Sequence, residues 1–326
     1  MLTDSFNRIH NYLRISLTDH CNLRCFYCIP EEGYLFSKQD QLMTAEEIFT
    51  LSSVFVRLGV NKIRLTGGEP LVRKDFAVIY EKLASLPVAL HLTTNGILIH
   101  EHIDLLKKYG CRSVNLSLDT LNPDTFLLLT RRNVFQQVYD NMINLVNSGF
   151  YVKVNVVVMK GINDEEINHF IALTRSLPLD IRFIEFMPFD GNYWVASKVF
   201  TMTEILKIIQ TEFNFEALPH EKNETAKRFN INGHRGTFSI ISTMSKPFCG
   251  DCNRMRLTAD GKLKNCLFSK SETDLRSALR TGKPVEPLIR ECIQQKSEML
   301  GGQINVNFEE LSAEEIKNRS MISIGG

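Results

Sequence analysis

Short β-like runs alternate with helical patterns from residue 12 to about residue 190 of this 326-residue chain. The β-like runs cover residues 12–18, 62–66, 89–94, 113–118, 151–158 and 180–187, and the helical patterns cover residues 45–58, 76–85, 102–109, 135–148 and 165–176. Thr44, with Glu47 three residues later, predicts a capping box at the start of the first helix. Alternation of this kind is typical of βαβ units, so the chain is predicted to form an α/β fold on a parallel sheet.

Polar and apolar side chains alternate along several of these strands, whereas strands buried on both faces of a parallel sheet are continuously apolar. In the first strand Leu13, Ile15 and Leu17 share the apolar face. The polar face carries Arg14, Ser16 and Thr18, then Arg64 and Thr66, His91 and Thr93, Asn115, Ser117 and Asp119, and Lys153 and Asn155. A polar face on a curved parallel sheet predicts a ligand cavity inside an open or partly closed barrel. A doubly wound sheet with exposed polar edges is the alternative.

The pattern changes after about residue 195. One more helix is predicted at residues 202–212, and short strands follow, including residues 237–243. The Asp260-Gly261 dipeptide separates residues 255–258 from residues 263–266, which predicts a hairpin. We therefore expect a barrel domain at residues 1–220 and a smaller C-terminal α+β domain at residues 221–326.

Three cysteines follow the first predicted strand with the spacing C-x3-C-x2-C: Cys21, Cys25 and Cys28. Three thiolates on one loop can hold three corners of an iron–sulfur cluster. Because no fourth cysteine lies nearby, one iron would remain open to a small chelating molecule. A zinc knuckle that lacks one ligand and a loop of unrelated cysteines are the alternatives, and the extra cysteine at the x3 spacing favours iron–sulfur.

A second group consists of Cys249, Cys252 and Cys266, with the spacing C-x2-C-x13-C. A zinc ribbon has two C-x2-C pairs, and here one pair is present without a histidine near Cys266. We interpret the group as an iron–sulfur site with one free iron, with zinc as the alternative. Arg254 and Arg256 lie between these cysteines and would point the same way from a strand, either as exposed arginines or as a site for an anion.

Positive charge is predicted to gather inside the barrel. Arg14, Arg64 and Lys153 project from its polar face. Buried cations without partners are unfavourable, so a polyanionic substrate is expected. No glycine-rich phosphate loop of the Walker type is present to argue for a nucleotide by itself.

The overall charge and hydropathy argue against a nucleic-acid-binding, membrane or secreted protein. A net charge of +1 gives no general attraction to nucleic acid or to an anionic membrane. No apolar run is long enough to cross a bilayer, and residues 1–16 lack an apolar stretch of signal-peptide length. The expected location is therefore the cytoplasm, where disulfides are rare. Cys111 and Cys292 stand apart from both groups and are predicted to be small core residues.

The cysteine loop and the next strand together resemble the radical S-adenosylmethionine superfamily. After the second strand comes Thr66-Gly67-Gly68-Glu69-Pro70, which is similar to the glycine-rich motif of that superfamily. The resemblance implies an incomplete (βα)6 barrel and a [4Fe-4S] cluster whose open iron binds S-adenosyl-L-methionine, which is cleaved to methionine and a 5′-deoxyadenosyl radical. The cofactor-binding residues that it implies are Tyr27, Gly68, Ser117 and Met187.

The C-terminal motifs narrow the resemblance. The segment Phe248–Gly261, followed by Cys266-Leu267-Phe268, resembles the GTP 3′,8-cyclase family of molybdenum cofactor biosynthesis. The similarity extends over essentially the whole chain and includes residues 93–96, 115–119, 152–155 and 182–187. It implies a second [4Fe-4S] cluster at Cys249, Cys252 and Cys266. The GTP-binding residues that it implies are Arg14, Arg64, Thr93, Lys153, Arg254 and Arg256. It also implies that the terminal Gly325 and Gly326 enter the active site.

The reaction that this resemblance implies begins with removal of the C3′ hydrogen of GTP. Formation of a C3′–C8 bond then gives (8S)-3′,8-cyclo-7,8-dihydroguanosine 5′-triphosphate, the first step of molybdopterin biosynthesis. A reducing electron donor such as a flavodoxin, a hand-over to cyclic pyranopterin monophosphate synthase and a homodimer are expected with it. The competing hypotheses are a radical enzyme that modifies peptides and has an auxiliary cluster, and a non-catalytic zinc or iron–sulfur protein.

Replacement of Cys25 provides the first test. The Cys25→Ala variant is expected to lose all cleavage of S-adenosylmethionine, because two thiolates cannot hold three corners of the cluster. Methionine and 5′-deoxyadenosine are measured after anaerobic reconstitution, with the parent protein as control. Cleavage that persists in the variant would contradict the assignment of this loop.

Overall fold

In the described part of the chain, the wall of a partial barrel is formed by one twelve-stranded sheet whose central strands run parallel. The computed structural model describes residues 1–29, 34–304 and 307–325. The strands are β1 Tyr12–Ser16, β2 Lys62–Thr66, β3 Ala89–Thr94, β4 Ser113–Ser117, β5 Tyr151–Val158, β6 Leu179–Glu185, β7 Phe215–Ala217, β8 Lys227–Ile231, β9 Thr237–Ile241, β10 Arg254–Leu257, β11 Lys262–Lys264 and β12 Thr273–Asp274. Their order in the sheet is β12-β11-β10-β1-β2-β3-β4-β5-β6-β9-β8-β7.

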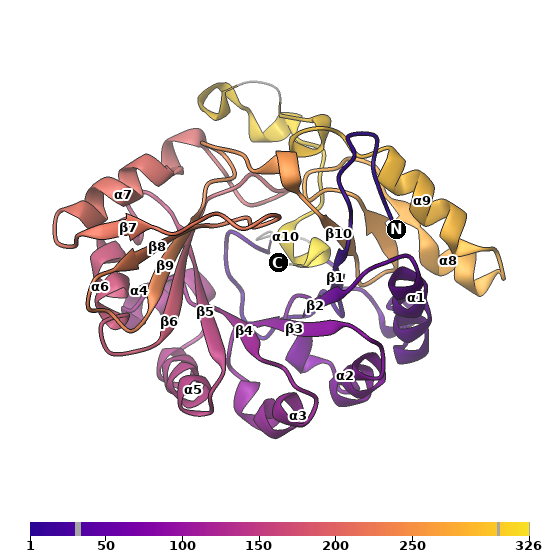
Figure 1. Ribbon diagram of the computed structural model, residues 1–326, viewed down its shortest axis with the longest axis horizontal. Helices are drawn as coiled ribbons and strands as arrows, with labels where there is room; N and C mark the ends of the chain where they lie inside the picture. Colours follow the sequence, from indigo (N-terminus) through magenta and orange to yellow (C-terminus); the bar gives the residue numbers. More distant parts are fainter. Residues whose placement is uncertain (30–33, 305–306, 326) are drawn as a thin grey trace.

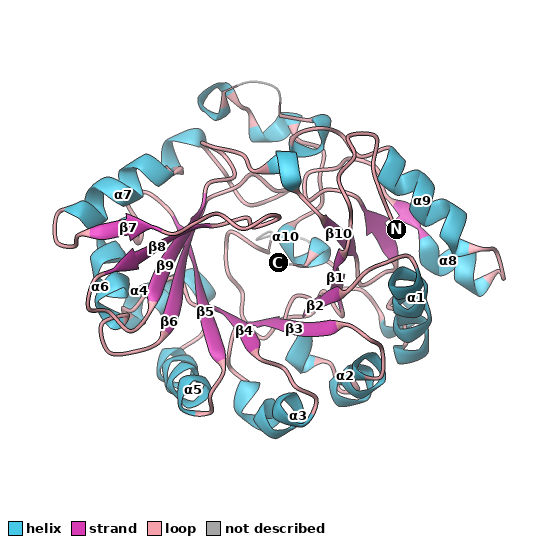
Figure 2. Ribbon diagram, in the orientation of Figure 1, coloured by secondary structure: helices cyan, strands magenta, loops and turns pink. Residues whose placement is uncertain are grey.

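Helices cover the outer side of this wall, and one short helix lies inside it (Figures 1 and 2). The helices are α1 Ala45–Arg57, α2 Phe76–Ala84, α3 Ile103–Lys108, α4 Pro123–Thr130, α5 Phe135–Asn147, α6 Ile167–Leu173, α7 Met202–Gln210, α8 Leu275–Arg280, α9 Val285–Gln294 and α10 Met321–Ile324. The capping box predicted for α1 is confirmed: the Glu47 amide donates to Thr44 Oγ1, and the Thr44 amide donates to Glu47 Oε2. The predicted incomplete α/β barrel is therefore correct, with α10 inside.

Register explains why one face of the sheet is polar. The parallel strands pair in register, so that Arg14 lies opposite Arg64 on β2 and opposite Arg256 on β10. Residues that are paired in register project to the same side of a sheet. The alternating polar side chains of each strand therefore all lie on the inner face. The intervening Leu13 and Ile15 are fully buried against the outer helices. Burial of such side chains, at about 25 cal/mol per Å² of apolar area, is the main favourable contribution to the folding of this wall.

The C-terminal part of the chain extends the sheet at both ends. β9 pairs in parallel with β6, and β10 pairs in parallel with β1. The predicted hairpin is present as antiparallel β10 and β11, joined by a turn in which Gly261 has a φ of 78°. Strands after residue 220 thus close part of the barrel wall. The division of the chain into domains at residue 220 stays a prediction.

The element boundaries differ from expectation at a few places. Helix α4 was not predicted, although Asn122 caps it and Pro123 occupies its first position, which is a standard start signal. β1 ends at Ser16 rather than at residue 18, because the Ser16 hydroxyl donates to the carbonyl of Thr18 as the chain turns. The helix expected at residues 165–176 is shorter, since a 3-10 turn at Asp164–Glu166 precedes α6.

The loops after β1 and β2 are in close contact through glycine. The Gly68 amide donates to the Thr18 carbonyl at 2.6 Å, and a Cβ atom on Gly68 would lie 2.7 Å from the carbonyl oxygen of Asp19. A Cβ atom on Gly67 would lie 2.8 Å from the Thr18 carbonyl oxygen. These glycines thus allow the loop after β2 to pack on the cysteine loop.

Substitution of Gly68 by Ala is expected to lower the free energy of unfolding by roughly 1–3 kcal/mol, because backbone atoms on the cysteine loop cannot move aside as a flexible side chain could. Thermal or denaturant unfolding measures the change. Gly250→Ala is the matched control, since a Cβ atom there would meet nothing within 4 Å. Equal stability of the two variants would contradict this account of the packing.

Candidate active site

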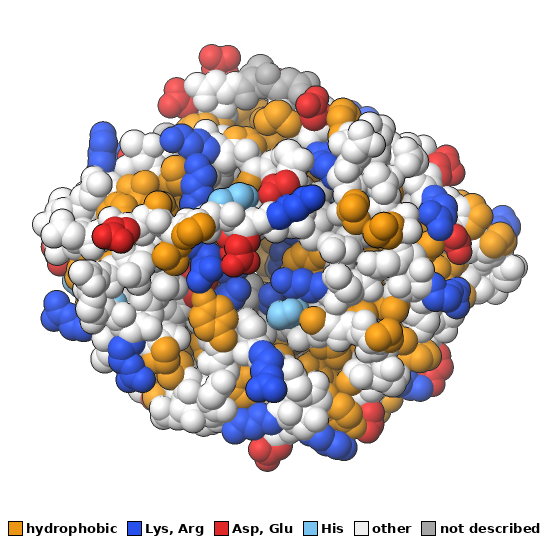
Figure 3. Space-filling model, in the orientation of Figure 1, with side chains coloured by type: hydrophobic (Ala, Val, Ile, Leu, Met, Phe, Trp, Pro, Cys, Tyr) orange, Lys and Arg blue, Asp and Glu red, His pale blue; other side chains and the backbone are white. Residues whose placement is uncertain are grey.

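A cavity of about 640 Å³ occupies the inside of the barrel. Side chains from β1, β2, β4, β5, β6 and β10 line it, together with residues 221–226 between β7 and β8. Lys and Arg side chains gather in the hollow at the centre of the face shown in Figure 3. The strand residues that line the cavity include Arg14, Arg64, Asn115, Lys153, Asn155, Arg182, Arg254 and Arg256. The polar face predicted from the sequence is therefore the cavity wall.

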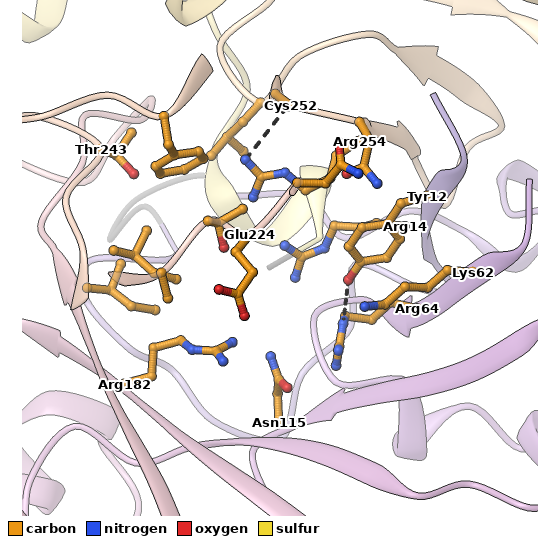
Figure 4. Close-up of a pocket in the computed structure, with 18 of the residues that line it drawn as sticks. Tyr12, Arg14, Lys62, Arg64, Asn115, Arg182, Glu224, Thr243, Cys252 and Arg254 are labelled. Atoms are coloured by element: carbon orange, nitrogen blue, oxygen red, sulfur yellow. Dashed lines mark hydrogen bonds between the residues drawn. The ribbon is translucent and has the colours of Figure 1, made fainter. Parts of the chain in front are cut away.

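Some polar side chains on the cavity wall form hydrogen bonds within the protein, and others contain atoms that have no partner. Arg64 Nε donates to the Tyr12 hydroxyl at 2.7 Å (Figure 4). Arg64 Nη1 donates to the Leu92 carbonyl at 2.9 Å. Among the described residues, Arg14 Nε and the Oδ1 atoms of Asn115 and Asn155 are buried and have no hydrogen-bond partner. Buried polar atoms are nearly always paired, so these atoms mark positions where a bound ligand would supply the partner.

The positive charges on the cavity wall lower one another's pKa values. Burial, followed by the charges of Arg64 and Arg254, lowers the pKa of Arg14 to about 10. Burial, followed by the charge of Arg182, lowers the pKa of Lys153 to about 8. Both directions show that the cations are desolvated and crowded. An anion placed among them would raise these pKa values again.

Tyr12 and Glu224 supply negative charge within reach of these cations. Burial alone would raise the pKa of Tyr12, but the charges of Arg64, Arg14 and Lys62 outweigh burial and lower the pKa to about 7. The Glu224 carboxylate projects into the cavity (Figure 4) and lies 3.9 Å from Arg228. Within the described part of the chain, acids that line the cavity are fewer than cations, so the site favours a polyanion.

The second group of cysteines lies at the edge of this cavity. Cys249, Cys252 and Cys266 all line it, and none forms a disulfide. Cys252 Sγ accepts hydrogen bonds from Arg254 Nη2 at 3.7 Å and from Lys296 Nζ at 3.6 Å. Burial would raise the pKa of Cys252, but these two cations lower it to about 6. Cys252 therefore offers a thiolate to a metal on the same wall that offers guanidinium groups to an anion, whereas burial raises the pKa of Cys249.

The first group of cysteines lies on the loop that leaves the carboxyl end of β1. Cys21 Sγ accepts from the Leu23 amide at 3.4 Å and from Asn95 Nδ2 at 3.7 Å. Burial, followed by the charge of Glu69, raises the pKa of Cys21 to about 11, and burial followed by the charge of Cys28 raises the pKa of Cys25 well above its usual value.

Three thiols with these properties fit an iron–sulfur cluster. They are free, close enough to repel one another as thiolates, and would ionise together only beside a positive centre. No set of three His, Cys, Asp or Glu side chains in residues 1–29, 34–304 and 307–325 is arranged to hold a metal ion. Three free cysteine thiols on one loop have the donor chemistry of an iron–sulfur cluster with cysteine at its corners.

The residues implied as cofactor contacts lie near the first cysteine loop or on the cavity wall. The Tyr27 hydroxyl donates to the carboxylate of Asp119, which follows β4. Ser117 is at the end of β4, and Met187 lines the cavity beyond β6. Gly68 packs on the backbone of the cysteine loop, as described above. Thr93, which is expected at the substrate, accepts a hydrogen bond at Oγ1 from Nη1 of the cavity residue Arg64, at 3.5 Å.

The C-terminal tail lies inside the barrel (Figure 1). Ile322 and Ile324 are 1% exposed, and the Ile322 amide donates to the Cys28 carbonyl at 3.4 Å. The Gly325 carbonyl accepts from Arg256 Nη1. A Cβ atom on Gly325, where φ is 86°, would lie 2.6 Å from Thr66 Oγ1, so glycine fits best there. Gly326 lies outside the described residues.

Several cavity residues are absent from the site residues predicted from the sequence, and Tyr12, Lys62 and Arg182 are three of them. Tyr12 and Lys62 begin β1 and β2, and Arg182 lies on β6. Tyr12 has the same parity as Arg14, and Lys62 the same parity as Arg64. Tyr12 and Lys62 each lie two residues before a predicted site residue, on the same face of the strand. Applying the alternation of polar residues to the first position of each strand would therefore have identified both.

Family profiles cover most of the chain. The Radical SAM superfamily matches residues 15–174, and Molybdenum Cofactor Synthesis C matches residues 179–301. Of the helices in the described residues, none is both long and apolar enough to cross a membrane.

Relatives match along the full length of this chain. The chain is 39% identical to GTP 3′,8-cyclase of Rhodopirellula baltica, covering 100% of this chain and 92% of that protein. It is 45% identical to the mitochondrial GTP 3′,8-cyclase of Arabidopsis thaliana, covering 100% and 84%. It is 47% identical to molybdenum cofactor biosynthesis protein 1 of Bos taurus, covering 99% of this chain and 51% of that protein. The chain thus spans about half the length of the first curated relatives.

Solved structures agree on the fold. Streptococcus suis SuiB bound to S-adenosylmethionine superposes with a TM-score of 0.66 at 15% identity, over 97% of this chain and 78% of that chain. At this identity the likeness supports the architecture alone.

The ionisation of Tyr12 gives a pH prediction. The affinity of the cavity for a polyanion, measured with GTP as the probe, should fall as pH rises through about 7, because ionised Tyr12 adds a negative charge to the cavity. The expected loss is of the order of 1 kcal/mol. In Tyr12→Phe this step should disappear, leaving the loss of the Lys153 charge near pH 8. Calorimetric titration across this range measures both. Identical pH profiles for the two proteins would contradict the prediction.

Proposed function

The chain belongs to the GTP 3′,8-cyclase family, and we propose that it is a radical S-adenosylmethionine lyase acting on GTP. The proposed product is (8S)-3′,8-cyclo-7,8-dihydroguanosine 5′-triphosphate, at the first step of molybdopterin biosynthesis. The observation that carries the proposal is the cationic cavity edged by Cys249, Cys252 and Cys266. Helix α10 links it to the other cysteine loop, since Met321 lines the cavity and Ile322 contacts Cys28.

Two [4Fe-4S] clusters and S-adenosyl-L-methionine are the proposed cofactors. Cys21, Cys25 and Cys28 would hold the first cluster, and Cys249, Cys252 and Cys266 the second. The residues proposed to bind S-adenosylmethionine are Tyr27, Gly68, Ser117 and Met187. When bound, the first cluster and S-adenosylmethionine would provide the radical chemistry that removes a hydrogen atom from C3′ of the GTP ribose.

The role proposed for the chain is to hold GTP at several points at once. Arg14, Arg64 and Lys153 would bind its anionic groups, with Lys62 and Arg182 as additional cations on the same wall. Arg64 is already oriented by Tyr12 and by the Leu92 carbonyl, so less conformational freedom is lost on binding. A substrate fixed in this way keeps C3′ and C8 in one geometry while the ring closes.

The tail would limit the space around the reacting atoms. Ile322 and Ile324 are buried, and the carbonyl of Gly325 occupies one donor of Arg256. We propose that Gly325 lies beside the substrate and helps to exclude water. Arg254 and Arg256 would then bridge the second cluster, the tail and GTP, because both line the cavity from β10.

A peptide-modifying radical enzyme is the weaker hypothesis. Such enzymes were expected to have more cysteines in the C-terminal part than the three used here. The two remaining cysteines, Cys111 and Cys292, are each 5% exposed in the packed core, where their thiols donate to the carbonyls of Ser113 and Leu263. The balance of charge in the cavity also suits a nucleotide triphosphate better than a peptide of unspecified charge.

Several features of the cellular context belong to the same proposal. A reducing electron donor such as a flavodoxin would deliver electrons, and the product would pass to cyclic pyranopterin monophosphate synthase. We further propose a homodimer in the cytoplasm without nucleic-acid or membrane partners, although the printed name of the A. thaliana relative assigns that protein to mitochondria.

Anaerobic incubation with GTP, S-adenosylmethionine and a chemical reductant tests the function. The reconstituted protein should form the 3′,8-cyclised nucleotide together with 5′-deoxyadenosine, as identified by mass spectrometry and NMR. Arg256→Ala should bind GTP about 10- to 100-fold more weakly, since a charge-assisted hydrogen bond contributes roughly 1.5–3 kcal/mol. Its first cluster should still cleave S-adenosylmethionine.

Two results would contradict the proposal. One is cleavage of S-adenosylmethionine by the parent protein without any change to GTP. The other is unaltered GTP affinity in Arg256→Ala, which would remove this residue from the substrate site.

A further inference from the structure

A buried lysine lies directly behind the second group of cysteines. Lys296 follows helix α9 and is 3% exposed. Its Nζ atom lies 3.0 Å from the Arg254 carbonyl oxygen, 3.5 Å from His10 Nδ1 and 3.6 Å from Cys252 Sγ. It does not line the substrate cavity, so the roles proposed above for the cavity wall leave it unexplained.

The hydrogen-bond geometry accounts for all three protons of the Lys296 ammonium group. His10 Nε2 lies 3.0 Å from Asp4 Oδ2, a carboxylate oxygen that only accepts, so Nε2 carries the ring proton and Nδ1 is the acceptor. The Arg254 carbonyl accepts a second proton. The third proton is then directed at Cys252 Sγ, which makes this contact a charge-assisted N–H···S hydrogen bond.

The sulfur is also the group that balances the charge of Lys296. Among the described residues, no carboxylate lies within ion-pair distance of its Nζ atom. Lys264 offers a contrast: it is 1% exposed, and its Nζ atom pairs with Glu272 at 3.4 Å. A buried ammonium group without a counter-charge would be strongly destabilising. The position of Lys296 is therefore favourable when Cys252 is a thiolate.

The N-terminal segment holds this arrangement in place. Arg8 donates to Asp4 Oδ2 at 2.6 Å, to the Cys249 carbonyl at 2.9 Å and to the Glu298 carbonyl at 2.7 Å. These contacts connect residues before β1, the second cysteine loop and the chain just after Lys296. The ammonium group is thus fixed by a buried network on both sides, which is what a precise contact with the sulfur requires.

We propose that Lys296 is a positioning residue for the second cluster, which orients Cys252 through a charge-assisted hydrogen bond to Sγ and raises the reduction potential of the cluster. Hydrogen bonds to ligand sulfur and nearby positive charge both favour the reduced, more negative cluster. The inference rests on the second cluster of the proposed function. Arg254 also donates to this sulfur, so Cys252 receives two cationic donors.

The test is a potentiometric titration of the anaerobically reconstituted holoprotein, followed by EPR spectroscopy. GTP identifies the signal of the second cluster and S-adenosylmethionine that of the first. Lys296→Met should shift the midpoint potential of the second cluster to more negative values and leave the first cluster unchanged. Lys296→Arg, which keeps the positive charge, should stay closer to the parent protein. Lys264→Met is the matched control, because it removes a buried lysine that pairs with Glu272.

The possible outcomes distinguish failure of this inference from failure of the proposed function. A second cluster that is present in Lys296→Met with an unchanged potential overturns the inference alone. A parent protein that binds only one cluster overturns both the inference and the proposed second cluster. Selective loss of the second cluster from a folded Lys296→Met chain, with its retention in Lys296→Arg, supports the inference. If Lys296→Met does not fold, Lys296→Gln takes its place, and the same shift is expected from loss of the charge.

Discussion

Parallel strands that pair in register bring like charges together on the inner face of this barrel, and the rest of the site depends on that constraint. Arg14 has Arg64 on one side and Arg256 on the other because β1 pairs with both β2 and β10. Such crowding is unfavourable in the free protein, as the lowered pKa values of Arg14 and Arg256 indicate. The wall is stable because the opposite phase, including Leu13 and Ile15, is completely buried.

The two groups of cysteines have different surroundings. The first group lies on a loop, where the close contact between Gly68 and the Thr18 carbonyl holds the chain. The second group lies beside the arginines of β10, and the positive charges of Arg254 and Lys296 lower the pKa of one of its members, Cys252. The tail helix α10 connects the two regions. The three cysteines and the cationic wall can therefore share one cavity without using the same side chains.

Much of the fold could be predicted because its signals are local. The limits of β2, β3 and β5 agree with the predicted residues, since period-2 alternation is imposed by the pleat of a strand. Helix α4 was missed although Asn122 and Pro123 mark its start, because its apolar residues lack a clear helical period. The role of Thr93 at the substrate stays a prediction; its Oγ1 accepts a hydrogen bond from Arg64 Nη1 at 3.5 Å, a contact between strands that no local pattern records.

The sequence by itself determined which side chains face inward and which cysteines lie together, because strand parity and short spacings follow from backbone geometry alone. It also contained the motifs that led to the family. Only the tertiary structure decided which distant segments meet. The pairing of β10 with β1, the contact of Ile322 with Cys28, and the approach of Lys296 to Cys252 join residues far apart in the chain. Such contacts depend on the packing of the whole barrel, which no local pattern records.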